Sequence, residues 1–113
     1  MALEDATRAA ADDLVEALRP LDATAKAMFG GYCYYLGGKV VGLVCDGRVF
    51  VKRSRRDDLL SGWAQLAPAY PGAKNSWRLP TGALVETPER VREVIEQVAA
   101  VLPARTPRRR ASR

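Results

Sequence analysis

Two tight turns within one apolar stretch, residues 28–52, constrain the fold of this chain more than any other feature. Gly37-Gly38 and Asp46-Gly47 are two-residue connections, and apolar residues flank both of them. Hairpin turns of this length need positive φ at one or both central positions, which Gly adopts freely and Asp better than most residues. The stretch therefore predicts a meander of three short antiparallel strands.

The turn lengths also predict which residues pair, because a two-residue turn fixes the register of its strands. Tyr35 is then opposite Val40, Cys33 is opposite Gly42, and Val44 is opposite Val49 and Gly31. One predicted face is small and smooth, and it holds Gly31, Cys33, Gly42, Val44, Val49 and Val51. The other is aromatic with charged ends, and its rows are Tyr32–Leu43–Phe50, Tyr34–Val41–Lys52 and Gly30–Cys45–Arg48.

We expect helices to cover the smooth face, which leaves the aromatic face for a later segment or a partner. Its candidate partner surface consists of Tyr32, Tyr34, Leu43 and Phe50. Such a row could meet a protein, including a second copy of this chain, or could stack bases, and ordinary packing explains it equally well. Because the register places Cys33 and Cys45 on opposite faces, we expect no disulfide between them.

Helical periodicity appears at both ends of the chain. Residues 2–19 combine helix-forming residues with an apolar stripe, and Pro20 ends the pattern. Near the C-terminus, Thr87 is a suitable N-cap and Pro88 fits the first helical position. Apolar residues at helical spacing continue from there to Leu102.

The middle of the chain is less regular. Residues 22–26 are expected to be a connector, and Ser54 is expected to cap a second helix over residues 55–66. Two short strands are predicted next, at residues 69–70 and 76–79, as an edge pairing added to the meander. The whole pattern predicts an α+β fold in two layers, with a mostly antiparallel sheet and helices on one side.

The charge of the chain is concentrated in its tail. The formal net charge is +5, and residues 103–113 contain five arginines and no acid. We therefore predict a near-neutral folded domain over residues 1–102 and a disordered tail over 103–113. The tail arginines could bind nucleic acid phosphates, or could only improve solubility; they are Arg105, Arg108, Arg109, Arg110 and Arg113.

Several kinds of chemistry have no support in the residues. The chain contains no histidine and two cysteines, so it lacks the commonest general base and the ligands of a structural zinc site. Gly30-Gly31 lacks the context of a phosphate-binding loop. No apolar run reaches the length of a membrane span. We expect no catalytic, metal or cofactor site, no small-molecule substrate, and a cytoplasmic protein with reduced thiols.

The stretch that forms the meander also resembles a known family. Met28-Phe29-Gly30-Gly31-Tyr32, followed by Gly38-Lys39, Asp46-Gly47-Arg48 and Val49-Phe50-Val51-Lys52, resembles the signature of the TfoX/Sxy N-terminal domain family. The resemblance extends over about residues 20–102, with Tyr70, Trp77 and Leu79-Pro80 fitting the same layout. It implies the order α-β-β-β-α-β-β-α in a fold like that of type III secretion chaperones.

The same resemblance bears on function. The family is named for regulators of bacterial competence, thought to act with a cyclic-AMP-receptor-type transcription activator and not as enzymes. It therefore implies a non-enzymatic regulatory module that binds a protein partner or itself. The alternative that the residues support is a small nucleic-acid-associated protein that uses its Arg-rich tail.

Overall fold

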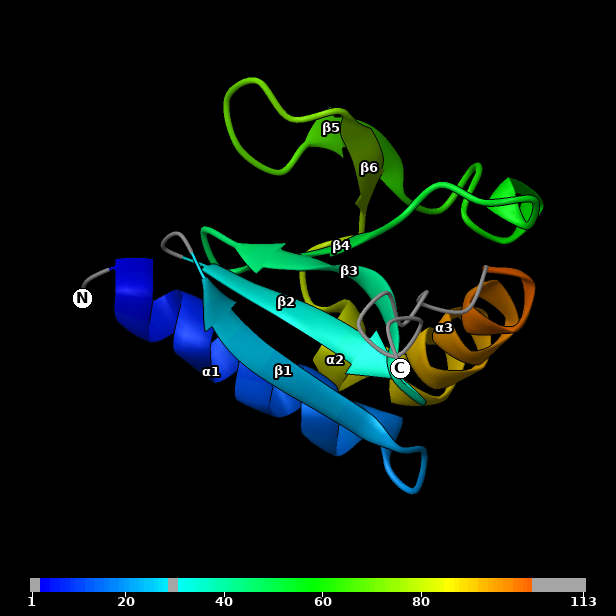
Figure 1. Ribbon diagram of the computed structural model, residues 1–113, viewed down its shortest axis with the longest axis horizontal. Helices are drawn as coiled ribbons and strands as arrows, with labels where there is room; N and C mark the ends of the chain where they lie inside the picture. Colours follow the sequence, from blue (N-terminus) through cyan, green and yellow to red (C-terminus); the bar gives the residue numbers. More distant parts are fainter. Residues whose placement is uncertain (1–2, 29–30, 103–113) are drawn as a thin grey trace, which may run out of the picture.

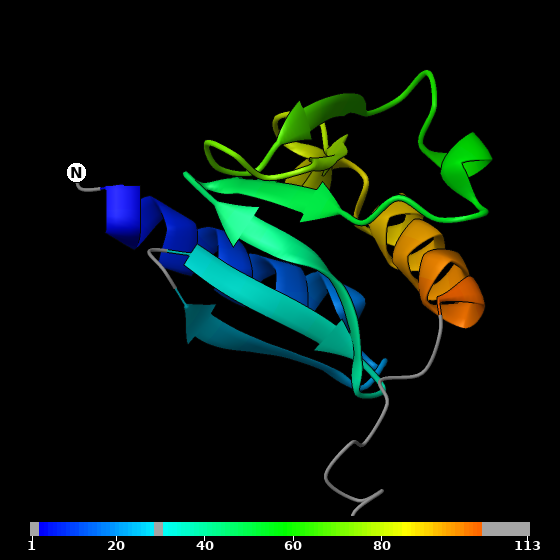
Figure 2. The same cartoon turned by 45° about the horizontal axis from the view of Figure 1, so that its top comes forward.

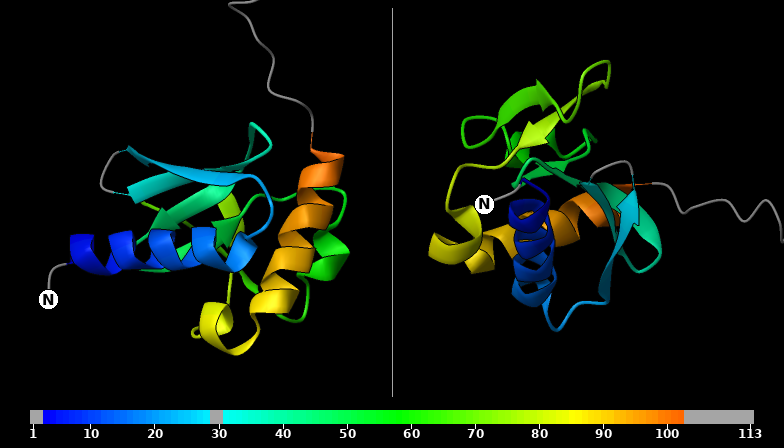
Figure 3. Two further views of the ribbon diagram at one scale, coloured as in Figure 1. Left: turned by 90° about the horizontal axis from the view of Figure 1, so that it is seen from below. Right: turned by 90° about the vertical axis from the view of Figure 1, so that its left-hand side faces the viewer.

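The computed structural model describes residues 3–28 and 31–102 as one six-stranded antiparallel sheet with its helices on one side (Figures 1 and 3). The α+β class is thus confirmed. The strands lie in the order β1-β2-β3-β4-β6-β5. The elements are α1 (Leu3–Leu18), β1 (Ala23–Met28), β2 (Gly31–Leu36), β3 (Lys39–Cys45), β4 (Arg48–Val51), the 3₁₀ helix η1 (Asp57–Leu59), β5 (Gln65–Pro68), β6 (Asn75–Arg78), α2 (Ala83–Glu86) and α3 (Pro88–Val101).

The meander forms as predicted, with both tight turns in place. Gly37, Gly38, Asp46 and Gly47 all have positive φ, as two-residue hairpins require. The second turn is also tied to α1, because the Gly47 amide donates to the Thr7 hydroxyl at 2.8 Å. Thr7 is the one buried polar residue of the described chain, and this bond satisfies its hydroxyl.

Residues 22–26 do not form a simple connector, so that prediction is wrong. Ala23–Met28 is an edge strand that pairs antiparallel with all six residues of β2. Its three alanines give little strand propensity. Pairing with β2 and contacts of Ala23 and Ala25 with the core stabilise the strand instead.

A β-bulge changes the predicted register between β2 and β3. Tyr35 pairs with Val40 as expected, but Tyr34 pairs with Gly42, so Val41 is an extra residue on β3. One extra residue moves every later residue of the partner strand to the opposite face. Cys33 is consequently opposite Leu43, and not opposite Gly42 as predicted.

The bulge points Tyr34 into the core beneath the helices. The side chain is fully buried, and its hydroxyl donates to the Phe50 carbonyl on β4 at 2.8 Å. The bond passes over Gly42 on β3, where a Cβ atom would collide with the Phe50 carbonyl oxygen and lie 2.7 Å from the Tyr34 hydroxyl. Burial, and then the neighbouring Cys33, raise the pKa of Tyr34, so the phenol remains protonated.

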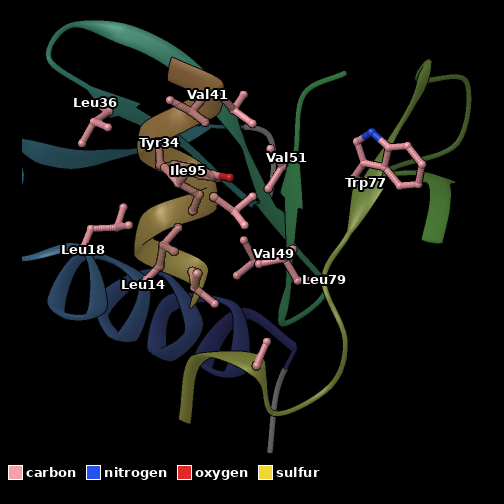
Figure 4. Close-up of a cluster of buried hydrophobic side chains, with 14 of the residues drawn as sticks. Leu14, Leu18, Tyr34, Leu36, Val41, Val49, Val51, Trp77, Leu79 and Ile95 are labelled. Atoms are coloured by element: carbon pink, nitrogen blue, oxygen red, sulfur yellow. The ribbon is translucent and has the colours of Figure 1, made fainter. Parts of the chain in front are cut away.

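The core lies between the inner face of the sheet and the helices. Leu14 and Leu18 of α1 and Ile95 of α3 meet Tyr34 there (Figure 4). The same cluster includes Val44, Val49 and Val51, which the sequence assigned correctly to the helix-covered face.

The predicted helix over residues 55–66 is wrong. Only η1 forms, Gly62 has a φ of 86°, and the chain continues directly into β5. The Asp57 carboxylate holds this turn: Oδ1 accepts from the Ser54 amide at 2.9 Å and from Trp77 Nε1 at 2.8 Å, and Oδ2 accepts from Arg53 Nε at 3.2 Å. Ser54 and Asp57 thus bond across three residues, but the bond closes one turn instead of starting the predicted helix.

The last third of the chain agrees with the sequence in part. The strand predicted at 76–79 is β6, and it extends the sheet beyond β4. Its hairpin partner is β5 at Gln65–Pro68 and not residues 69–70. The final helix begins at Pro88 after Thr87 as predicted, and the short α2 before it was not predicted.

Because the Tyr34 side chain crosses over Gly42, we expect substitutions at the two positions to lower the free energy of unfolding by different amounts. Gly42→Ala adds a methyl group that displaces the Phe50 carbonyl and disrupts the buried hydrogen bond, so we expect a loss of about 3 kcal/mol in the free energy of unfolding. Tyr34→Phe removes only the hydroxyl, with an expected loss of about 1.5 kcal/mol. Urea titration measures both, and a smaller loss for Gly42→Ala than for Tyr34→Phe would contradict this packing.

The Asp57 contacts predict a pH-dependent stabilisation. Partial burial, the largest single influence, raises the pKa, but the bonds from Ser54, Trp77 and Arg53 together lower it. A lowered folded pKa gives stability that is complete above the unfolded pKa of about 3.9 and is lost as pH falls through the folded pKa.

We therefore expect Asp57→Asn to cost about 1–2 kcal/mol at neutral pH and to flatten the stability profile below about pH 5. Asp58→Asn is the matched control, because that side chain is 62% exposed, and it should cost less than about 0.5 kcal/mol. Denaturant midpoints across the acid range provide the measurement. Equal losses for the two variants at neutral pH would show that Asp57 does not hold the turn.

Candidate functional site

One face of the sheet carries no helix in the described structure (Figure 3). We call it the helix-free face. The strand pairings place one row of side chains on it that crosses all six strands: Lys26, Cys33, Leu43, Phe50, Arg78 and Gln65. The row has an apolar centre with a cation on either side. Cys33 and Phe50 are buried but lie outside the main core cluster, because they belong to this second face.

The structure does not assemble the predicted partner surface as a set. Leu43 and Phe50 lie on the helix-free face as expected, but Tyr32 and Tyr34 face the helices because of the bulge. Tyr34 is fully buried and Phe50 is only 4% exposed, so neither ring offers a surface. In the row, Cys33 takes the place that was predicted for Tyr32.

The two cysteines share the helix-free face, contrary to the prediction that they lie on opposite faces. Cys45 is two residues from Leu43, the partner of Cys33, and its Sγ lies beside Gly31. Both thiols are free in the structure. Burial, and then the charge of Asp46, raise the pKa of the Cys45 thiol, which favours its less reactive protonated form.

A basic pocket of about 620 Å³ opens where β4 ends and β6 begins. It is lined by Lys52, Arg53, Lys74, Asn75 and Ser76, which are three cations and two neutral hydrogen-bonding residues. Asp57 outside the pocket holds the Arg53 guanidinium at one nitrogen. The sequence predicted that Lys52 lies at one end of the aromatic face. It did not predict that Lys74 would line the same pocket as Lys52.

A second surface lies on the helix side of the molecule. A hollow of about 350 Å³ is bounded by α1, the β3–β4 turn and the segment that leads into α2. Its α1 wall is formed by Ala6, Ala9, Ala10 and Asp13, and its far wall includes Leu84 and Val85. An adjoining hollow of about 380 Å³ shares Asp13, Leu84 and Val85 and continues between α1 and the start of α3. We call the two together the α1–α2 groove.

Val85 stands between the two hollows and is 79% exposed, more than any other large apolar residue of the described chain. The acids Asp13 and Glu89 line the groove without a described ion-pair partner, and its two cations are bonded to backbone carbonyls: Arg48 donates to the Leu79 carbonyl at 2.9 Å. Arg92 donates to the Arg19 carbonyl at 3.2 Å. The groove is thus mainly apolar, and the charges along its rim that lack such a bond or an ion pair are acidic. Sequence reasoning missed it because α2 is too short to show a helical period.

Both tryptophans pack within the fold. The Arg90 guanidinium lies 4.2 Å from the centre of the Trp63 ring, and Trp77 is buried. No group of three or more Cys, Asp or Glu side chains that could hold a metal ion occurs among residues 3–28 and 31–102. Within the same ranges, no helix is long and apolar enough to cross a membrane. The tail arginines lie outside the described residues.

Comparison with known proteins agrees with the resemblance seen in the sequence. The family model of the TfoX N-terminal domain matches residues 13–101. The chain is also 35% identical over 82 residues to a protein of Spirochaeta aurantia described as an uncharacterized 12.7 kDa protein in the trpE 5′ region, with 73% of this chain and 70% of that protein covered. No solved structure matches. Since the family match spans α1 to α3, the chain belongs to the TfoX N-terminal domain family.

Proposed function

We propose that this protein is a non-enzymatic regulatory module that works by binding a protein partner, and that the α1–α2 groove receives the partner. The family is known in competence regulation, which supports a regulatory role over a catalytic one. A cytoplasmic location belongs to the same proposal, and the free thiols of Cys33 and Cys45 are compatible with it.

The exposure of Val85 is the observation that carries this proposal. In α2, Ala83 is buried and Leu84 packs against the core, whereas Val85 stays mostly exposed and adds little to the core of this chain. An exposed apolar side chain flanked by two hollows is typical of a surface that a protein partner covers.

The charge of the groove indicates what such a partner presents. Asp13 and Glu89 line it without a described basic counterpart, whereas Arg92 is already engaged with a backbone carbonyl. A segment with apolar side chains for the hollows and basic residues at its flanks complements this surface. The same rim disfavours a second copy of the groove as the occupant, because acids would then face acids.

The proposal predicts that contact depends on Val85. A photo-crosslinking residue at position 85, in cells that produce the full chain, should yield one dominant adduct that the same residue at position 66 does not yield. Leu66 is a suitable control because it is also exposed, at 41%, and lies on β5 away from the groove.

The partner identified in this way is then purified and titrated by calorimetry. Val85→Asp should raise its Kd about tenfold or more, while Leu66→Asp should leave it within about twofold. Asp13→Lys should also raise the Kd of a partner that presents basic residues. Circular dichroism checks that each variant is folded. Equal adducts at both positions, or an unchanged Kd for Val85→Asp, would refute the groove as the binding surface.

A further inference from the structure

The charges of this protein are separated between its two layers. None of the six described strands contains an acid, and they hold four basic residues, Lys26, Lys39, Arg48 and Arg78. The helices hold most of the acids, five in α1, one in α2 and three in α3. The neutral sum of the folded body therefore conceals an acidic helix side and a basic sheet.

Most strand cations belong to the helix-free face. Lys26, Arg48 and Arg78 lie on it by their pairing with Cys33, Cys45 and Phe50. The exception is Lys39, whose ammonium donates to the Ala99 carbonyl of α3 at 2.9 Å. Burial, and then the charge of Arg78, lower the pKa of Arg48, so these two cations lie close enough to repel each other.

The basic pocket continues this cationic surface. Arg78 lies two residues along β6 from Ser76, which lines the pocket, a distance of about 7 Å along a strand. Lys52 and Lys74 are exposed and have no ion pair among the described residues. The bond from Asp57 orients Arg53 while occupying only its Nε, so its two terminal nitrogens remain for a ligand.

An exposed aromatic residue accompanies these cations. Tyr70 is 54% exposed and lies in the same β5–β6 connection as Lys74. In Figures 1 and 2 this hairpin lies away from α1, beyond β4. A basic track together with an accessible aromatic ring is the combination by which single-stranded nucleic acids are held, with phosphates on the cations and a base on the ring.

We propose that the basic pocket and the adjoining helix-free face bind single-stranded nucleic acid, with phosphates at Lys52, Lys74 and Arg78 and a base stacked on Tyr70. An acidic protein segment would also suit the cations, but the exposed ring of Tyr70, in the same β5–β6 connection as Lys74, favours a ligand that has π-faces. The Arg-rich tail can add attraction to any polyanion, and the proposed site does not require it.

The test compares two variants that lower the net charge equally. The face variant carries Lys52→Gln, Lys74→Gln and Arg78→Gln, and the helix-side variant carries Arg8→Gln, Arg19→Gln and Arg90→Gln. A third variant replaces the five tail arginines with Gln. Fluorescence anisotropy with a labelled mixed-sequence DNA strand of about 20 nucleotides reports the Kd between about 50 and 200 mM salt.

We expect the face variant to raise the Kd about tenfold or more at the lower salt concentration and to reduce the salt slope by about 2. The Kd of the helix-side variant should stay within about threefold of the wild-type Kd. The tail variant should still bind the DNA strand through the helix-free face. Tyr70→Ser should raise the Kd about fivefold or more for the single strand.

Four results would overturn the proposal: no binding by the wild type, equal effects of the face and helix-side variants, duplex DNA bound as tightly as the single strand, or competition by poly-glutamate at equal charge. The last result would assign the surface to an acidic protein. Circular dichroism of each variant distinguishes a lost contact from a lost fold, and Tyr70→Ser provides a charge-neutral test on an exposed loop residue.

Discussion

The arrangement of the whole sheet depends on the hydrogen bond that Tyr34 donates to the Phe50 carbonyl across Gly42. The bond links β2 to β4 directly, and it exists only because the bulge at Val41 points Tyr34 inward. The same displacement places Cys33 on the helix-free face. One extra residue in β3 therefore decides both what fills the core and what the opposite surface presents.

Sequence reasoning succeeded where short-range chemistry decides the outcome. The turns at Gly37-Gly38 and Asp46-Gly47 require positive φ, so the residues beside them pair as expected, as Tyr35 and Val40 do. The prediction failed in the β2–β3 pair beyond Tyr35, because no residue of β3 indicates the bulge. Val40 and Val41 are equally suited to a strand, and only the fit of Tyr34 beneath the helices selects the extra residue.

The other errors arose from competition between local pattern and distant contacts. Leu59, Leu60, Trp63 and Leu66 follow helical spacing, yet Leu66 pairs with Trp77 in β5 and β6. Asp57 bonds to Trp77, twenty residues away, and the left-handed Gly62 reverses the chain. The alanine-rich β1 shows the opposite case, since its strand is imposed by β2. Such pairings cannot be predicted from periodicity, because each partner lies in another segment.

The net charge of the folded body did not indicate its charged surfaces, because it does not show in which elements the acids and the cations lie. A folded body with balanced charges can still present an acidic groove and a basic face if its acids lie in helices and its strands contain only cations. The α1–α2 groove and the helix-free face therefore favour ligands of opposite charge. Arg48 lies where they meet, because it lines the groove, bonds to the Leu79 carbonyl and is repelled by Arg78. Most of each surface therefore belongs to a different layer, and the two layers differ in the sign of their charge because the acids lie in the helices and the strands contain only cations.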